Sequence, residues 1–266
     1  MKSIVCVQNL KKSFGTLKVL RGISFEVYSG ETVVILGASG SGKSVLLQIL
    51  VGLLSADEGK IWVHGYEVTR FRHEKEWYPI RLKTGFLFQA GGLYDSMTVY
   101  ENIAFALRFH LKLPETEIKK KVKEVLSAVQ LEGIEDKYPA QLSGGMQRRV
   151  ALARAIALNP PLILYDEPTT GLDPIRSAVI SELIRHLQKT YGITSIVVTH
   201  DLNCAFKVAD RLMFLHEGKI LVTGDVDTFR QDKNPYLKQF LEGKIEEAIR
   251  LCNKRKLDDL EDVLIE

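Results

Sequence analysis

The chain has 266 residues, of which 45% are hydrophobic and 26% charged, as is typical of a globular protein rather than a disordered one. The formal net charge of +3 is too small to indicate a nucleic-acid partner, and we expect none. Three isolated cysteines without metal or disulfide spacing, and no apolar stretch near the roughly 20 residues of a membrane span, predict a soluble, cytoplasmic protein.

The predicted elements change character along the chain. Short apolar runs punctuated by glycine predict strands joined by turns over the first 35 residues, and two further strands are expected at residues 59–63 and 84–88. From residue 99 to about 158 the apolar spacing becomes helical. Strand patterns then return at residues 162–165, 195–198, 212–215 and 219–222. A helical block inserted between two α/β halves is the predicted architecture.

The glycine-rich segment GASGSGKS follows the buried-strand pattern TVVIL and precedes an apolar helix pattern. In that context, glycines let successive N–H groups point at phosphate oxygens, and the start of the helix adds partial positive charge. Lys43 is predicted to reach the phosphates and Ser44 to coordinate Mg²⁺. The alternative is a flexible turn with a surface lysine. The candidate phosphate-binding residues are Gly37, Ala38, Ser39, Gly40, Ser41, Gly42, Lys43 and Ser44.

Two adjacent carboxylates end the apolar strand pattern LILY. Asp166 at the end of a buried strand can hold Mg²⁺ beside the phosphate loop. Glu167 can then polarise a water molecule for attack on the γ-phosphate. The alternative is an ordinary acidic strand end, which leaves the pairing with a phosphate loop unexplained.

A second glycine turn, LSGGMQ, opens an alanine-rich helix. The N–H groups around Ser143, Gly144 and Gly145 offer another site for an anion. Taken alone, the motif is also compatible with a simple helix N-cap.

Together these motifs resemble the ATP-binding cassette (ABC) family of ATPases over residues 1 to about 235. The resemblance implies an α/β P-loop NTPase fold: a RecA-like core with an antiparallel β subdomain and an inserted α-helical subdomain. It also implies a homodimer in which Ser143, Gly144 and Gly145 contact ATP held by the partner's loop. The further residues that it implicates are Gln89 (Mg²⁺ and the attacking water), His200 (γ-phosphate), Asp173 (dimer interface) and Phe14 (adenine, where the family usually has tyrosine).

Single-cassette length favours a transporter subunit that pairs with separate integral-membrane permeases over a soluble, non-transport cassette ATPase. The segment GGLYDSMTVYENIA, with GMQRR and YDEPTTGLDP, is most similar to the Mla/Mce-type lipid-transport ATPases. This resemblance implies a lipid-binding Mce-domain partner and a peripheral location at the cytoplasmic face of the inner membrane. The runners-up are amino-acid importers and then cell-division complexes. The segment 88–99 contains apolar residues, which predict that the permease docks there. The alternative is that this segment is a buried loop.

The expected domain division places the nucleotide-binding domain at residues 1–240, with the helical subdomain at about 90–158. Residues 241–266 form an expected C-terminal tail, in which Ile245, Ile249 and Cys252 recur at helical spacing. This pattern predicts short amphipathic helices. Packing on the chain's own cassette and bracing of a partner remain equally open, because an apolar stripe does not identify what covers it.

Overall fold

Two β-sheets and the helices around them make up the computed structural model, which describes residues 3–242. The predictions for the tail beyond residue 242 therefore lie outside the described residues. The predicted α/β class is confirmed. Strand order is β10-β9-β3-β8-β7-β6 in the core sheet and β2-β1-β4-β5 in the smaller sheet. The strands are β1 (Ser3–Phe14), β2 (Leu17–Tyr28), β3 (Thr32–Leu36), β4 (Glu58–Val63), β5 (Tyr66–Glu67), β6 (Thr84–Leu87), β7 (Leu162–Asp166), β8 (Thr194–Thr199), β9 (Arg211–His216) and β10 (Lys219–Gly224).

The core sheet is parallel from β9 to β6, and only β10 joins it antiparallel. Every residue of β3, β7 and β8 is buried, because both faces of these strands are covered. Along β3, Val33 and Ile35 point to one apolar cluster while Val34 and Leu36 point to the other. The continuous apolar runs of the sequence therefore fill two cores at once.

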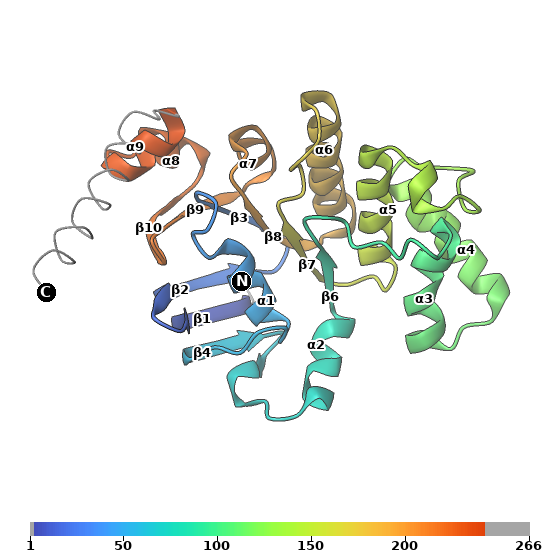
Figure 1. Cartoon of the computed structure of the whole chain (residues 1–266), viewed down its shortest axis with the longest axis horizontal. Coiled ribbons are helices and arrows are strands. Elements are labelled where there is room, and N and C mark those ends of the chain that lie inside the picture. Colours follow the sequence, from blue (N-terminus) through green and yellow to red (C-terminus); the bar gives the residue numbers. More distant parts are fainter. Residues whose placement is uncertain (1–2, 243–266) are drawn as a thin grey trace, which may run out of the picture.

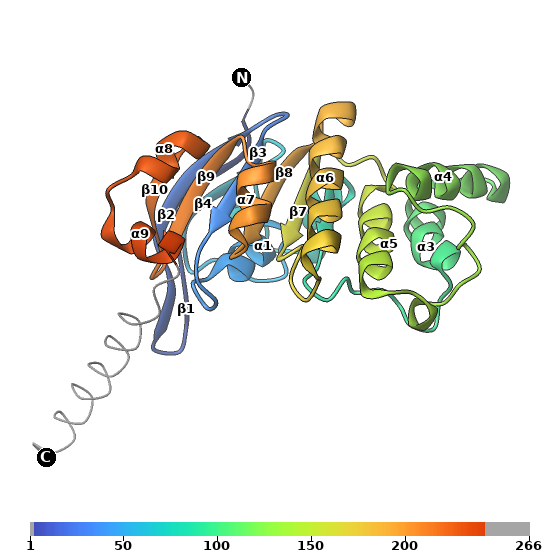
Figure 2. The same ribbon diagram turned by 90° about the horizontal axis from the view of Figure 1, so that it is seen from above.

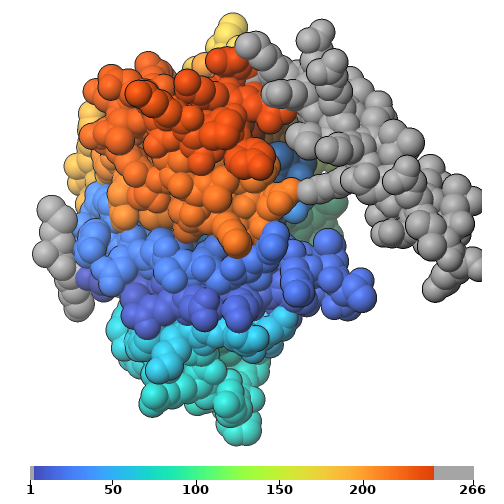
Figure 3. All heavy atoms as spheres, turned by 90° about the vertical axis from the view of Figure 1, so that its left-hand side faces the viewer, coloured from blue at the N-terminus to red at the C-terminus, as the bar shows by residue number. Residues whose placement is uncertain are grey.

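The smaller sheet lies against the C-terminal part of the cassette. Figure 3 shows the blue strands β1 and β2 between the orange-to-red C-terminal segment and the cyan segment around β4. The contact is specific, since the backbone N–H of Arg21 in β2 donates to the carbonyl of Gly218 at 2.8 Å. This sheet carries Phe14 to the edge of the core sheet.

Three long helices, α3, α4 and α5, lie at one end of the long axis of the molecule, and the N-terminal strands lie toward the other (Figures 1 and 2). Residues 129–143 between α4 and α5 contain only a short 3-10 turn, so the sequence pattern overstated the helix there. The helices are α1 (Lys43–Leu50), α2 (Tyr78–Leu82), α3 (Val99–Leu111), α4 (Glu115–Ala128), α5 (Gly144–Ile156), α6 (Pro174–Tyr191), α7 (Leu202–Val208), α8 (Val226–Gln231) and α9 (Pro235–Glu242).

None of the helices within residues 3–242 is long and apolar enough to cross a lipid bilayer.

Candidate functional site

The polar residues predicted from the sequence follow neighbouring strands of the core sheet. Leu36, the last residue of β3, pairs with Thr199 at the end of β8, and Asp166 of β7 pairs with Val198. Because these strands are parallel, the loops that follow them emerge at one edge of the sheet, where ligands bind in open α/β folds. The phosphate loop, the two carboxylates and His200 therefore meet, although they are far apart in the sequence.

Glycine is needed at two positions of the phosphate loop. Gly42 caps the N-terminus of α1 at φ 99°, a left-handed conformation that other residues rarely adopt. At Gly37 a Cβ atom would approach the carbonyl oxygen of Leu215 to 2.4 Å. The loop is thus folded tightly against β9 and turns directly into α1, which leaves the N–H groups at the helix start facing the site.

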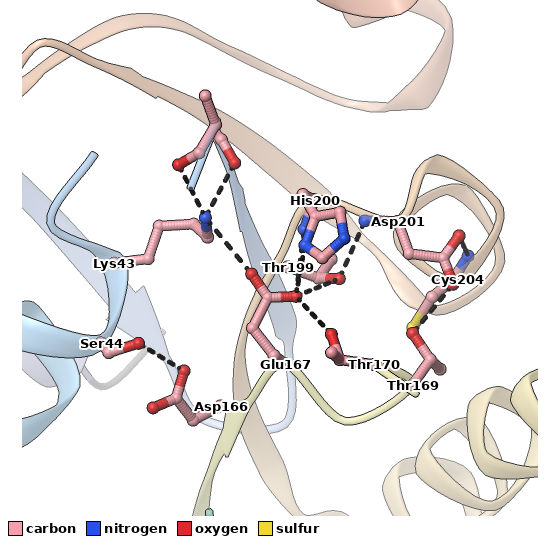
Figure 4. A network of polar contacts seen from close by, with 12 residues as sticks. Lys43, Ser44, Asp166, Glu167, Thr169, Thr170, Thr199, His200, Asp201 and Cys204 are labelled. Atoms are coloured by element: carbon pink, nitrogen blue, oxygen red, sulfur yellow. Dashed lines mark hydrogen bonds and ion pairs between the residues drawn. The ribbon is translucent and has the colours of Figure 1, made fainter. Parts of the chain in front are cut away.

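The side chain of Lys43 is 5% exposed, and its ammonium group lies inside this loop. It donates to the carbonyl oxygens of Gly37 at 2.8 Å and Ala38 at 3.0 Å. It also lies 3.3 Å from Oε1 of Glu167. The surface-lysine alternative is therefore wrong, because the charge is held at the centre of the site (Figure 4).

Asp166 and Ser44 form a pair of oxygen donors next to the loop, with Ser44 Oγ donating to Asp166 Oδ1 at 2.7 Å. Burial raises the pKa of the Asp166 carboxyl, with a smaller contribution from the negative charge of Glu167. A nearby cation would favour the ionised form of this buried carboxyl. Carboxylate and hydroxyl oxygens are ligands that Mg²⁺ prefers, so the donor set fits the predicted metal.

Glu167 occupies the centre of a network of polar contacts (Figure 4). Its Oε2 lies 2.9 Å from Nδ1 of His200, and because a carboxylate can only accept, the imidazole is the donor. Its backbone has φ 47°, which is uncommon for a residue with a side chain. The loop after β7 thus turns sharply and directs the Glu167 carboxylate between Lys43 and His200.

A hollow of about 400 Å³ opens over these groups. Phe14 from the end of β1, a residue that is 45% exposed, lines it, and so does Gln89 from the segment after β6. The predicted site residues that line it are Phe14, Ser39, Gly40, Gly42, Lys43, Ser44, Gln89, Glu167 and His200.

Gly37, Ala38, Ser41 and Asp166 lie in or beside the phosphate loop without lining the hollow, whereas the other predicted residues lie in a second cluster. Ser143 caps α5 and accepts the N–H of Met146 at 3.3 Å. Gly145 packs against the side chain of Arg176, whose backbone N–H is capped by Asp173 at 2.9 Å. The predicted site residues therefore form two separate clusters in one chain, one around Lys43 and the other around Ser143, Gly144, Gly145 and Asp173.

Arg148 has a role that was not predicted from the sequence. It connects helix α5 with the segments that follow β6 and β7. It extends from α5, is 8% exposed, and donates to the carbonyl oxygens of Phe88 at 2.9 Å, of Gln89 and of Thr170 at 3.1 Å. It thus connects the Gln89 segment with the loop that follows Glu167. Arginine in an alanine-rich helix pattern gives no sign of this role.

Thr170 and Thr199 were also missed. Their hydroxyl groups donate to Oε2 of Glu167 at 3.3 and 3.2 Å. Thr199 is a β-branched residue in a strand pattern, and such residues are common in strands without any polar role.

Known proteins match this chain over most of its length. The family described as "ABC transporter" matches residues 20–170. The chain is similar to the intermembrane phospholipid transport system ATP-binding protein MlaF of Haemophilus influenzae, with 37% identity over 94% of each chain. It is also 41% identical to a probable ribonucleotide transport ATP-binding protein of Mycobacterium leprae, covering 90% of this chain and 68% of that protein.

One similar solved structure is a dimer of the ATP-binding cassette MJ0796 in a post-hydrolysis state bound to ADP and Pi. It has a TM-score of 0.77 and 35% identity, and the match covers 84% of this chain and 98% of that one.

Proposed function

Because this chain belongs to the ABC transporter family of ATP-hydrolysing cassettes, we propose that it is the subunit that energises lipid transport through a separate permease. The observation that supports the ATPase chemistry is the meeting of Lys43, Asp166, Glu167 and His200 at one edge of the core sheet. A surface turn with an acidic strand end would not bury a lysine and two carboxylates together.

Each residue of the site has its own role in the proposed hydrolysis of ATP. Lys43 and the loop N–H groups bind the phosphates, and Phe14 supplies a ring face for adenine. Ser44, Asp166 and Gln89 would hold Mg²⁺, which offsets the charge on the phosphates when bound. The oxygen of a water molecule forms a bond to the γ-phosphorus while the bond to the bridging oxygen of ADP breaks. Glu167 receives the proton of that water, and His200 holds the γ-phosphate.

The second cluster supports a head-to-tail homodimer. Ser143, Gly144, Gly145 and Asp173 lie outside the hollow of their own chain, so in the proposed dimer they complete the hollow of the partner. A dimer of the similar cassette MJ0796 supports this arrangement. Light scattering of the Glu167→Gln variant with ATP tests it, because a cassette that stays monomeric under these conditions contradicts the proposal.

Exposed aromatic rings support the permease proposal. Tyr94 is 49%, Phe105 47% and Phe109 69% exposed, and their rings follow one another at 5.9 and 6.5 Å between centroids. Arg154 fixes the Tyr94 segment by donating to the carbonyl oxygens of Gly91 and Gly92. We expect cysteines at Tyr94 or Ser96 to cross-link to the permease. Cross-links from a distant face alone would contradict this docking site.

Lipid cargo rests on likeness alone. MlaF is named for phospholipid transport, whereas another relative is named for ribonucleotide transport. In the proposed complex the chain lies at the cytoplasmic face of the inner membrane, with the permease and an Mce-domain lipid-binding protein.

Deleting the gene in its host and measuring the phospholipids of each membrane by mass spectrometry tests this cargo. A change in lipid distribution supports it. Loss of amino-acid uptake or a division defect with unchanged lipids favours the two alternative transport complexes, and no defect in transport or division favours a soluble cassette.

A further inference from the structure

The two oxygens of the Glu167 carboxylate have different surroundings. Oε1 lies 3.3 Å from Lys43 and faces the phosphate loop. Oε2 accepts from the hydroxyl of Thr199 at 3.2 Å, the hydroxyl of Thr170 at 3.3 Å, and both Nδ1 and the backbone N–H of His200 at 2.9 and 3.3 Å. Four donors of the protein thus hold Oε2, whereas Oε1 contacts Lys43 on the side of the phosphate loop.

The hydroxyl of Thr199 takes part in a second hydrogen bond that orients it. Its oxygen accepts the backbone N–H of Asp201 at 3.0 Å. Asp201 is itself fixed, because its carboxylate caps α7 through the N–H groups of Asn203 and Cys204 and accepts from Thr169 at 2.8 Å. A hydroxyl that accepts this fixed N–H points its own hydrogen toward Glu167.

Thr199 is itself held rigidly. It is the last residue of β8, is 0% exposed, and pairs with Leu36 at the start of the phosphate loop. Thr170 lies in the loop after β7 and is only partly buried. Of the two hydroxyls, Thr199 therefore has the geometry to define the position of the carboxylate relative to the loop.

We infer that Thr199 is a positioning residue for ATP hydrolysis: its hydroxyl fixes Oε2 of Glu167 so that Oε1 faces the attacking water. Thr170 assists from the other side of the same oxygen. The inference rests on the proposed role of Glu167 as the group that accepts the proton of that water. Thr199 is fully buried and does not line the hollow, so it acts through Glu167.

The test is Thr199→Val, which keeps the β-branched shape and removes the hydroxyl. A hydrogen bond to a charged group contributes about 1.5–3 kcal/mol, so losing it lowers kcat about ten- to a hundredfold. The KM for ATP and the affinity for a non-hydrolysable ATP analogue stay at the wild-type values, since the phosphate loop is unchanged. Thr199→Ser restores the hydroxyl and returns kcat to within about threefold of wild type.

Thr32→Val is the matched control. Thr32 is also 0% exposed, lies on the adjacent strand β3, and has a hydroxyl without a partner in the described structure. The same substitution there leaves kcat unchanged. If Thr199→Val turns over ATP at the wild-type rate, or if Thr199→Ser is as slow as Thr199→Val, the inference is overturned. A rise in KM equal to the fall in kcat/KM also overturns it.

Glu167→Gln separates this inference from the proposed function. If Glu167→Gln hydrolyses ATP at the wild-type rate, the role of Glu167 fails and the inference fails with it. If Glu167→Gln is inactive while Thr199→Val is fully active, only the inference about Thr199 fails.

Discussion

Charged side chains are buried at the nucleotide hollow and exposed in the ion pair of the helical block formed by α3, α4 and α5. At the hollow, Lys43, Asp166 and Glu167 are each at most 6% exposed. Lys43 contacts Glu167 directly, and its neighbour Ser44 donates to Asp166. In the helical block, the ion pair of Arg108 with Glu115 has side chains 44% and 49% exposed and joins the end of α3 to the start of the next helix.

This difference in burial indicates which charged residues we expect to act in binding and catalysis. Burying a charge is costly, and removing one member of a buried pair leaves the other without compensation. Exposed pairs contribute little to stability because water and salt screen them. The buried set is therefore expected to be retained for binding and catalysis, whereas the exposed set supports local helix geometry. Substitutions in the two regions test this comparison directly.

The largest effect is expected for Lys43→Ala. Without the ammonium group the loop loses the charge that binds the phosphates, so ATP binding and turnover both fall below detection. Fluorescent-nucleotide titration and phosphate release measure the two. Lys207→Ala, which removes an exposed ion pair with Glu182, is the control and keeps wild-type values. Normal ATP affinity in Lys43→Ala would falsify the assignment of the phosphate loop.

The Glu167→Gln substitution is expected to lower the rate of ATP turnover and to preserve ATP binding. The amide preserves the shape of the side chain and removes the group that accepts a proton, a loss of about 10²–10⁴ in kcat. ATP then accumulates on a closed dimer, which gel filtration with ATP detects. Hydrolysis at the wild-type rate shows that another group accepts the proton.

The features of the fold and site that short sequence motifs determine were predicted from the sequence, whereas those that depend on contacts between distant segments were not. The phosphate loop and the carboxylates at the end of β7 were predicted because each is a short motif next to a strongly apolar strand. The burial of Ile118, Val122 and Val125 in α4 follows from helical spacing alone. The class of fold followed from the same local patterns.

The parts that were missed depend on contacts between distant segments. β1 and β2 are each 12 residues long, but polar residues and register shifts interrupt their apolar runs, so only fragments were predicted. Arg148 donates to a residue 60 positions away, and Thr199 donates to a residue 32 positions away. No local pattern marks such partners.

Arg148→Met is expected to weaken the junction between the two regions. Methionine fills much of the same space but removes the donor to the carbonyl groups of Phe88, Gln89 and Thr170, of which Phe88 keeps the N–H of Gly91. A hydrogen bond to a charged group contributes about 1.5–3 kcal/mol, so losing the three bonds of this guanidinium is expected to lower the free energy of unfolding by at least about 2 kcal/mol. Chemical denaturation measures it. Arg149→Met on the same helix loses one exposed contact, to the carbonyl of Gln130, and should be affected much less.

The smallest effect is expected for Glu115→Gln in the helical block. Hydrogen bonds from Arg108 and Tyr100 lower the pKa of the Glu115 carboxyl from its ordinary value of 4.5 to about 2. A lowered pKa in the folded state means that the ionised carboxylate adds stability above pH 4.5, and that this contribution disappears as the pH falls toward 2. Because Glu115 is exposed, salt screens the interaction and the gain is small at every pH. Thermal unfolding at low salt should therefore show wild type slightly above Glu115→Gln at pH 7 and a difference that shrinks below pH 4.5. A difference that grows on acidification would mean that Glu115 stabilises the fold as a neutral acid, and the contrast drawn between exposed and buried charge would not apply to it.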